Sequence, residues 1–317
     1  MHSKRILELK SSTSGLKLPA ASAGNGASLV PPQGATRART SGFVFQNYVA
    51  CPELGADDLA AISSTDIRTI TRHIEKQYLE SARSGYFRFG TIESYRAKEA
   101  GIDGRFGDRT DGVQSDVVYS KSGKYNVIFN GNLVSAGRMS GVDDPVVFRT
   151  IANEYCSCSS IGIYDARRAA LLISSGNNDI EAFVTYDVEA LKAAIMEILS
   201  ERHQKTLRLL GRPVEYRKKD RRWQIEDSFE RQDNRDQLNL YLETAFVKVP
   251  DFKHEEEFRL LLLDPSAPGR LSVADEAVTI FNDARIVAAI RDSGTFTSDG
   301  TPCRDSRATQ HAVENLP

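Results

Sequence analysis

The sequence predicts an α+β fold, a mixed or mostly antiparallel sheet with amphipathic helices packed on it, in one domain. Helical and strand-like patterns are interspersed along the chain, but they do not follow the regular strand-helix-strand order of a doubly wound sheet. Hydrophobic residues make up 40% of the 317 residues and charged residues 26%, which is ordinary usage for a chain with a buried core. No internal repeat is visible.

Composition divides the chain into three parts. Residues 11–41 are rich in Ser, Ala, Gly, Pro and Thr, and such a stretch cannot bury enough apolar area to offset the entropy lost on ordering. We therefore expect a disordered arm over 1–41, a single folded domain over 42–291 and a polar, frayed tail over 292–317. The arm has a mild positive bias, which fits a solvated tail or a segment for targeting or partner binding.

The first half of the domain is expected to hold a helix and several strands. Ser64 or Thr65 can cap a helix, and apolar residues then recur every three or four positions up to Tyr78. Gly85 supplies the left-handed residue that often ends a helix. The Asn-Gly pair at 130–131 predicts a hairpin turn. The expected strands are 86–90, 127–129, 133–134, 146–148, 155–157, 161–164 and 183–186.

The second half of the domain is expected to contain more helix. An apolar stripe predicts a helix over 188–210, closed by Gly211. A basic segment, 217–223, follows as a linker, and a third helical region covers 229–248. The last expected strands are 258–263, 278–281 and 286–290.

Charge and cysteine content narrow the classes of function. The 41 basic and 43 acidic side chains give a formal net charge of −2, so no global field attracts nucleic acid or an anionic membrane. The sequence shows neither a secretory leader nor an apolar run near the roughly 20 residues that span a bilayer. Cys51, Cys156, Cys158 and Cys303 lack the spacing of zinc ligands and favour a reducing compartment. We expect a cytoplasmic protein, or one delivered into a host cytosol, without a metal or membrane contact.

Common cofactor and nucleophile motifs are absent from the sequence. There is no phosphate-binding Gly-x-x-x-x-Gly-Lys loop, no dinucleotide fingerprint after a strand and no Gly-x-Ser-x-Gly elbow. The five histidines lie far apart, and His73 and His203 fall inside expected helices, where a structural role is expected.

Three consecutive glutamates open one of the expected strands and carry the best chemical signal in the sequence. Side chains alternate along a strand, so Glu255, Glu257 and Arg259 should share one face. Two carboxylates beside an arginine could orient hydroxyl groups and stabilise a developing cation. The other interpretation is an exposed acidic strand edge that pairs with Arg259 and protects the sheet from aggregation.

Two basic features each have two interpretations. Arg88 lies in an otherwise aromatic strand and could bind a phosphate by a two-pronged hydrogen bond, or it could pair with Glu93 or Glu99. The run 217–223, which ends in Trp223, could bind nucleic acid through phosphates and stacking, or it could be a solvated linker.

Two segments resemble a group of uncharacterised bacterial proteins. Residues 87–96, Phe-Arg-Phe-Gly-Thr-Ile-Glu-Ser-Tyr-Arg, resemble that group's arginine-bearing strand and turn, which continues into a loop with an Asp-then-Gly pattern, here 107–112. Residues 248–259 resemble its ending, a lysine followed by Glu-x-Glu-aromatic-Arg. With the Ser/Cys strand 155–160 between them, the order is similar to that of the Arg-Ser-Glu ADP-ribosyltransferases.

The resemblance to these transferases implies a site that uses NAD as its substrate. Arg88 would bind a phosphate of NAD, and Ser157 or Ser159 would order the site. Glu255 would position the acceptor. Glu257 would orient a ribose hydroxyl and stabilise the oxocarbenium-like state as nicotinamide leaves. Such chemistry needs positioning and electrostatic stabilisation, which carboxylates and an arginine can supply.

Two hypotheses of function follow. The first is an ADP-ribosyltransferase-like enzyme that transfers ADP-ribose from NAD to an unidentified macromolecule, a protein or a nucleic acid, in a toxin, effector or defence protein. The second is a non-enzymatic interaction protein that uses the acidic strand edge and the basic Trp223 segment. The enzyme needs Arg88, Ser157 or Ser159, and Glu257 to converge on one cleft, whereas the interaction protein needs an exposed surface around Trp223.

Overall fold

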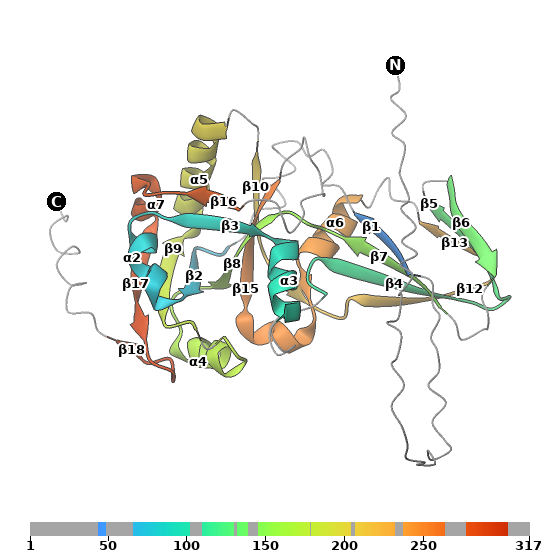
Figure 1. Ribbon diagram of the computed structural model, residues 1–317, viewed down its shortest axis with the longest axis horizontal. Helices are drawn as coiled ribbons and strands as arrows, with labels where there is room; N and C mark the ends of the chain where they lie inside the picture. Colours follow the sequence, from blue (N-terminus) through green and yellow to red (C-terminus); the bar gives the residue numbers. More distant parts are fainter. Residues whose placement is uncertain are drawn as a thin grey trace, which may run out of the picture. The chain divides into compact units, whose positions relative to one another are not determined.

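The structure is a computed structural model that describes residues 44–48, 66–101, 110–129, 132–138, 145–177, 179–203, 207–231, 237–263 and 277–303 (Figure 1). All of these residues belong to the compact unit Thr40–Pro317. The expected hairpin turn at 130–131 and the expected arm over 1–41 lie outside the described residues.

The expected α+β fold is confirmed by a nine-stranded, mostly antiparallel sheet with several short helices. Its main path runs β10 (Arg208–Pro213), β15 (Glu257–Leu263), β8 (Tyr155–Ile161), β2 (Thr69–Ile74), β9 (Ala182–Asp187), β17 (Ile290–Phe296) and β18 (Pro302–Cys303). Beside this path, β3 (Phe87–Thr91) pairs with β8 and with β16 (Val278–Ile280).

Three smaller sheets contain the other strands. The four-stranded sheet runs β1 (Val44–Tyr48), β7 (Val146–Ile151), β4 (Val113–Ser120) and β12 (Asp220–Ile225). The three-stranded sheet runs β13 (Ser228–Arg231), β5 (Lys124–Phe129) and β6 (Asn132–Arg138). The two-stranded sheet is β11 (Glu215–Tyr216) with β14 (Val247–Lys248).

The helices are short apart from α5, and they pack on both faces of the nine-stranded sheet (Figure 1). The α-helices are α2 (Leu79–Arg83), α3 (Ile92–Gly101), α4 (Ala166–Ser174), α5 (Val188–His203), α6 (Gln237–Ala245) and α7 (Ala284–Ala288). The 3-10 helices are η1 (Lys76–Tyr78) and η2 (Pro250–Glu255). Among the described helices, none is both long and apolar enough to cross a membrane.

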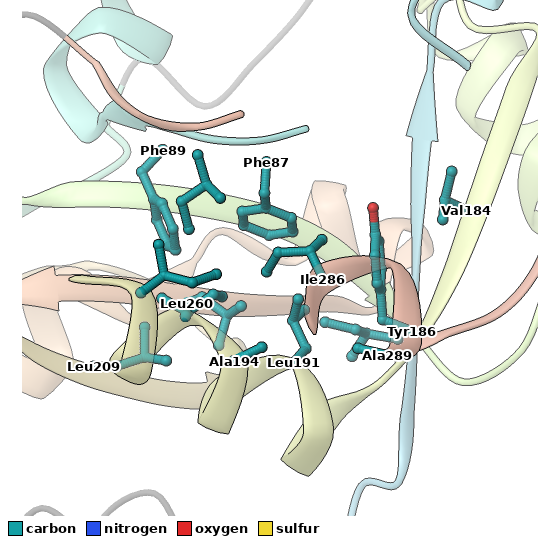
Figure 2. Close-up of a cluster of buried hydrophobic side chains, with 14 of the residues drawn as sticks. Phe87, Phe89, Val184, Tyr186, Leu191, Ala194, Leu209, Leu260, Ile286 and Ala289 are labelled. Atoms are coloured by element: carbon teal, nitrogen blue, oxygen red, sulfur yellow. The ribbon is translucent and has the colours of Figure 1, made fainter. Parts of the chain in front are cut away.

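Strand β15 forms part of two hydrophobic clusters, because its alternating side chains enter the core on both faces. Phe258 and Leu260 belong to the cluster that also contains Phe87 of β3, Leu191 of α5 and Ile286 of α7 (Figure 2). Leu261 and Leu263 belong to the second cluster, with side chains of α3 and α6. All seven residues of β15 are buried, the run of four leucines at 260–263 among them.

In the nine-stranded sheet, one edge of β8 pairs with a single strand and the other edge with two. One edge of β8 pairs with β15 along six residues. On the other edge, β3 pairs with Tyr155 and Cys156, whereas β2 pairs with Ser160 and Ile161. The strands that carry the predicted arginine, serine and glutamate residues, β3, β8 and β15, are therefore neighbours in one sheet.

The helix expected over 65–84 is wrong over its first half, where the structure has the strand β2 followed by η1 and α2. The β-branched run from Thr69 to Thr71 pairs with β9 and β8, and this tertiary pairing overrides the helical spacing of the isoleucines. The helix end at Gly85 is confirmed. Gly85 has φ +88°, and an added Cβ atom would lie 2.3 Å from the backbone oxygen of Asp283.

Three expectations for the second half are also corrected. Helix α5 ends at His203, and Gly211 lies in β10 instead of closing the helix. The region 229–248 contains β13, α6 and β14, so only its centre is helical. Residues 286–290 are mainly α7, and the sheet continues beyond Arg291 through β17 and β18, because β17 pairs along β9.

Candidate functional site

The Glu-x-Glu segment lies in a buried ion cluster and not at a solvated strand edge. Glu257 is 3% exposed and Arg259 is 0% exposed. Arg259 Nε lies 2.8 Å from Glu257 Oε1, which confirms that these two residues share a face of β15. Glu255 belongs to η2 and not to the strand, yet its carboxylate also reaches the cluster through Lys248. The expectation of an exposed acidic edge is therefore wrong.

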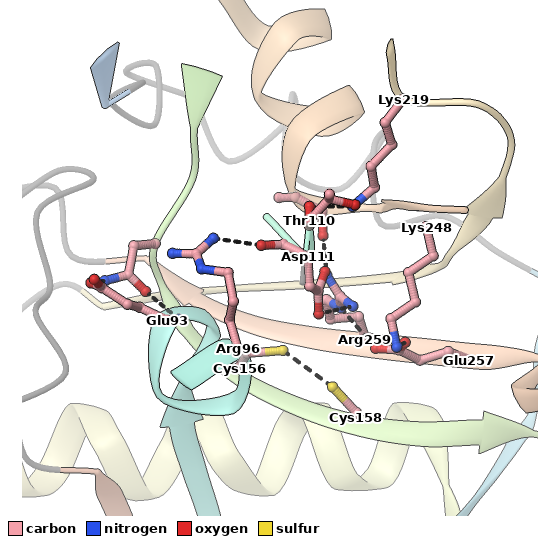
Figure 3. A network of polar contacts seen from close by, with 12 residues as sticks. Glu93, Arg96, Thr110, Asp111, Cys156, Cys158, Lys219, Lys248, Glu257 and Arg259 are labelled. Carbon is pink, nitrogen blue, oxygen red and sulfur yellow. Dashed lines mark hydrogen bonds and ion pairs between the residues drawn. The ribbon is translucent and has the colours of Figure 1, made fainter. Parts of the chain in front are cut away.

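Lys248 of β14 joins the two carboxylates. Its Nζ atom lies 2.8 Å from Glu257 Oε2 (Figure 3). The same atom lies 2.7 Å from Glu255 Oε2. The Glu257 backbone N–H donates to the Tyr216 hydroxyl at 2.8 Å. Both carboxylate oxygens of Glu257 are thus occupied by cations, one by Arg259 and the other by Lys248.

Asp111 completes the cluster from a distant part of the chain. Its two oxygens accept from Arg259 Nη1 and Nη2 at 3.0 and 3.1 Å, a two-pronged contact. Arg96 of α3 donates to the Asp111 backbone oxygen at 2.6 Å (Figure 3). Arg259 also donates to the carbonyl of Ala245 at the end of α6. Gly112 has φ +64°, and an added Cβ atom would lie 2.6 Å from the Ala152 oxygen, so the turn after Asp111 requires glycine.

The charged side chains of the cluster shift one another's pKa values. Burial alone would raise the pKa of Glu257, but Arg259 and Lys248 hold this pKa far below its usual range. Burial raises the pKa of Glu255, and Lys248 offsets this only in part. Burial alone would lower the pKa of Arg259, but Asp111 and Glu257 raise it well above its usual value. The cluster therefore keeps Glu257 and Arg259 charged, and Glu255 is more easily protonated than Glu257.

Two cysteines lie next to the ion cluster on the same face. The Sγ atoms of Cys156 and Cys158 are 3.5 Å apart, and either thiol could donate a hydrogen bond to the other. The hydrogen bond to Cys156, together with burial, raises the pKa of the Cys158 thiol well above its usual value. Both cysteines are free, and their thiols act as hydrogen-bonding and packing groups in the core.

Ser157 and Ser159 lie on the opposite face of β8 from the ion cluster. The register pairs Ser157 with Leu260 and Ser159 with Phe258, both of which point into the first hydrophobic cluster. The residue that faces Glu257 is Ser160. The two predicted serines are buried, and the Ser157 hydroxyl forms no hydrogen bond with the described residues. The structure thus does not bring these serines together with Glu257.

Arg88 is exposed on β3, while its neighbours Phe87 and Phe89 are fully buried. It lies opposite Thr279 of β16. The alternative partner Glu93 instead accepts from Asn153 Nδ2 at 3.0 Å, and Arg88 forms no ion pair with the part of the chain that the structure describes. The side chain of Glu99 lies outside the described residues.

The basic segment 217–223 is mostly strand, so the interpretation as a solvated linker is wrong. Residues 220–225 form β12, which pairs in parallel with β4 at the end of the four-stranded sheet. Trp223 is 41% exposed, and its indole N–H donates to Asp116 Oδ1 at 3.0 Å. Arg221 Nη2 lies 2.5 Å from Glu243 Oε2 of α6. The segment is therefore an exposed strand whose tryptophan has a fixed orientation.

Sequence reasoning missed the roles of Asp111 and Lys248, although both lie in segments that the resemblance covers. Asp111 is 148 positions from Arg259, and no local pattern pairs the two. Across the described ranges, no three His, Cys, Asp or Glu side chains gather as metal ligands would.

Comparison of the chain with protein-family models, with curated proteins and with solved structures gave no match. The function must therefore be inferred from the geometry of the described residues.

Proposed function

We propose that the protein acts by binding a macromolecular partner through an exposed surface formed by Lys218, Arg222 and Trp223, here called the β12 surface. The observation that carries this proposal is the 41% exposure of Trp223, the single tryptophan of the chain, on an end strand of a sheet. Tryptophan and arginine are the residue types that most often dominate the affinity of protein interfaces. An indole already fixed by a hydrogen bond loses little freedom on binding.

The state of the Glu-x-Glu strand supports binding over catalysis. A catalytic carboxylate must be free to contact a substrate, but both oxygens of Glu257 are bound by cations inside the core. The serines of β8 that would share its ligand point to the other side of the sheet. The carboxylates of Glu255 and Glu257, together with Arg259, are better explained as structural charges that hold α6, β14 and η2 against β15.

Site-specific photo-crosslinking tests the binding proposal. A benzophenone amino acid is placed in the full-length protein at Gln224, the exposed residue next to Trp223 of the β12 surface, or, as control, at Arg167, an exposed residue of α4. We expect a discrete adduct from Gln224 in cells that produce the protein, lost when Arg222→Glu is added, and none from Arg167. Equal labelling from both positions, or an adduct that is indifferent to Arg222→Glu, would contradict the proposal.

A second candidate is the ADP-ribosyltransferase-like enzyme with NAD as substrate, and the neighbouring positions of β3, β8 and β15 favour it. In such an enzyme Arg88 binds a phosphate and Glu257 exchanges Lys248 for a ribose hydroxyl, with Glu255 turned toward an acceptor. Ser157 and Ser159 then act from the far face of β8, by holding the strand in place.

Nicotinamide release separates the two candidates. The purified protein is incubated with NAD and cell lysate, alongside Glu257→Gln and the exposed control Glu80→Gln. Release by the wild type and Glu80→Gln, lost in a folded Glu257→Gln variant, would establish the enzyme. On the binding proposal we expect all three proteins to release no more nicotinamide than a lysate blank.

A further inference from the structure

The strand pairing along β8 is interrupted at one place in the nine-stranded sheet. On the edge of β8 that faces β2 and β3, residues 155–156 pair with β3 and residues 160–161 pair with β2. None of the described strands pairs with residues 157–159 on this edge, although β15 pairs with them on the other. We call this interruption the β8 break. The middle of β8 therefore lies beside two strands that do not pair with it at these positions.

Arg72 of β2 reaches toward β3 at the β8 break. Its Nη2 atom donates to the Arg88 backbone oxygen at 3.4 Å, and its guanidinium carbon lies 5.0 Å from the centre of the Phe87 ring. The Arg72 side chain is half-buried, and it forms no ion pair with a residue that the structure describes. A guanidinium has five N–H donors. The single backbone acceptor therefore leaves most of the donors of Arg72 available to a ligand.

Two buried hydroxyl groups on the same face of the sheet also lack partners. Ser157 of β8 is 1% exposed and Tyr186 of β9 is 0% exposed, and within the described ranges neither hydroxyl forms a hydrogen bond. Tyr186 belongs to the first hydrophobic cluster, and Ser157 pairs with Leu260 of that cluster. Arg72 lies two positions from Ile70, another member, so its side chain leaves β2 on this same face.

The Phe87 ring contacts both Arg72 and Tyr186. The rings of Phe87 and Tyr186 meet edge to face, with their centres 5.8 Å apart (Figure 2). Burial raises the pKa of Tyr186 to about 12, and the nearby charge of Arg72 opposes this rise. Buried polar groups in proteins nearly always have a hydrogen-bond partner. A cation and two hydroxyls without acceptors in one region therefore indicate an acceptor that comes from outside the chain.

We propose that the β8 break binds the terminal phosphate of a small molecule, held by Arg72 and by the hydroxyls of Ser157 and Tyr186. These three donors come from three strands, so they approach a ligand from different directions. The three free oxygens of a phosphate ester can accept from all of them, whereas a planar carboxylate is satisfied by a guanidinium alone. Because both hydroxyls are buried, a small ligand reaches them and a macromolecular backbone does not.

This phosphate site goes beyond the proposed function and is independent of it. It uses no residue of the β12 surface. It also lies on the face of β8 opposite Glu257, because Glu257 pairs with Ser160 and Ser157 pairs with Leu260. A failure of the phosphate site would leave binding at the β12 surface standing, and the reverse also holds.

Calorimetric titration of the full-length protein with phenyl phosphate and with benzoate tests this inference. The two probes carry the same ring and differ in the anionic group. We expect phenyl phosphate to bind at least ten-fold more tightly than benzoate, and inorganic phosphate to compete with it. Equal affinity for the two probes would overturn the choice of phosphate over carboxylate. A lack of any binding of phenyl phosphate would overturn the site.

Variants of the full-length chain show whether the binding is at the β8 break. Arg72→Gln should weaken phenyl phosphate at least ten-fold, because a charge-assisted hydrogen bond is lost. Arg72→Lys keeps the charge in case the glutamine variant does not fold, and it should also weaken binding because it removes the two-pronged donor. The control Arg167→Gln on α4 should change nothing.

Ser157→Ala separates a ligand-binding role from a structural one. Its hydroxyl has no partner among the described residues, so without ligand the variant should be as stable as the wild type in urea unfolding. The stabilisation that phenyl phosphate adds should nevertheless be smaller in this variant. Unchanged affinity for phenyl phosphate in both Arg72→Lys and Ser157→Ala would overturn the phosphate site.

Discussion

Two charged segments of this chain, 255–259 and 217–223, have opposite positions in the fold. One of the two interpretations placed the first at a solvated edge, but its Glu257 and Arg259 are among the most buried residues of the described chain. The second was expected in a linker, and it is an exposed strand that ends a sheet. Charge content alone does not decide burial.

The difference between the two segments lies in the number of partners that the fold supplies. Arg259 has Asp111, Glu257 and the carbonyl of Ala245, so four of its five N–H groups face an acceptor. Arg222 has no ion-pair partner among the described residues, and it remains in water. A buried charge is tolerated only where its partners are complete.

The largest effect should come from removing the central cation. Arg259→Met leaves Asp111 and Glu257 buried without a guanidinium, which costs about 3–5 kcal/mol of unfolding free energy. Urea unfolding followed by circular dichroism measures the loss. In a variant that already carries Asp111→Asn, the same substitution should cost clearly less, because part of the unpaired charge is gone. Equal costs in both backgrounds would show that the two residues do not act together.

The two carboxylates of the cluster should differ at neutral pH. The depressed pKa of Glu257 means that its ionised form stabilises the fold above the ordinary pKa of 4.5 and that this contribution is lost on acidification. The raised pKa of Glu255 has the opposite sign, so its ionised form weakens the fold as the pH rises above 4.5. We expect Glu257→Gln to cost about 2–3 kcal/mol at pH 7, and Glu255→Gln less than about 1 kcal/mol.

Unfolding of these two variants at pH 7 and at pH 4 gives the measurement. The penalty of Glu257→Gln should shrink at the lower pH, because protonation removes part of the wild-type contribution. A penalty of Glu255→Gln that equals that of Glu257→Gln at pH 7 would mean that Lys248 stabilises both carboxylates alike.

His73 is an intermediate case, a half-buried side chain whose Nε2 atom is buried without a hydrogen-bond partner among the described residues. Its ring lies near Tyr164 and Phe296. Burial, with a smaller effect of Arg168, lowers the pKa of His73 from 6.5 to about 4, although Asp165 opposes the shift. The unfolded chain therefore binds a proton below pH 6.5 that the folded chain does not.

Stability should consequently fall as the pH falls from 6.5 toward 4. Between pH 8 and pH 5 the contribution of His73 to this loss is about 2 kcal/mol. In the His73→Gln variant, which has no group to protonate, the pH dependence of the unfolding free energy should be flatter by that amount. An unchanged slope would place the proton uptake on another residue.

Local signals predicted the parts of the fold that depend on local chemistry. The turn at Gly85 follows from its left-handed backbone, and strands β7, β9 and β15 follow from short apolar runs. The helix expected over β2 was wrong because the pairing of β2 with β8 and β9 is tertiary, and no local pattern reveals it.

Which side chains meet at the candidate site depends on the pairing register of β8 with β15, and the sequence alone does not determine that register. Alternation along β8 and along β15 is predictable for each strand separately, but which faces coincide is decided by their pairing. Because Glu257 pairs with Ser160, the glutamate face meets Cys158 and Cys156. A shift of one residue would have placed Ser157 and Ser159 on that face. Asp111 could not be foreseen for a related reason, since its contact with Arg259 is made across 148 positions.

The smallest effect should come from the same Arg→Met change on the exposed segment. Arg222 has its guanidinium in water and no buried partner to leave behind, so Arg222→Met should alter the unfolding free energy by less than about 0.5 kcal/mol. When Arg222→Met is measured in the same urea series as Arg259→Met, the two losses of unfolding free energy can be compared directly, one for each segment. A cost above 1 kcal/mol would mean that Arg222 has a partner in the folded state that its exposure does not indicate.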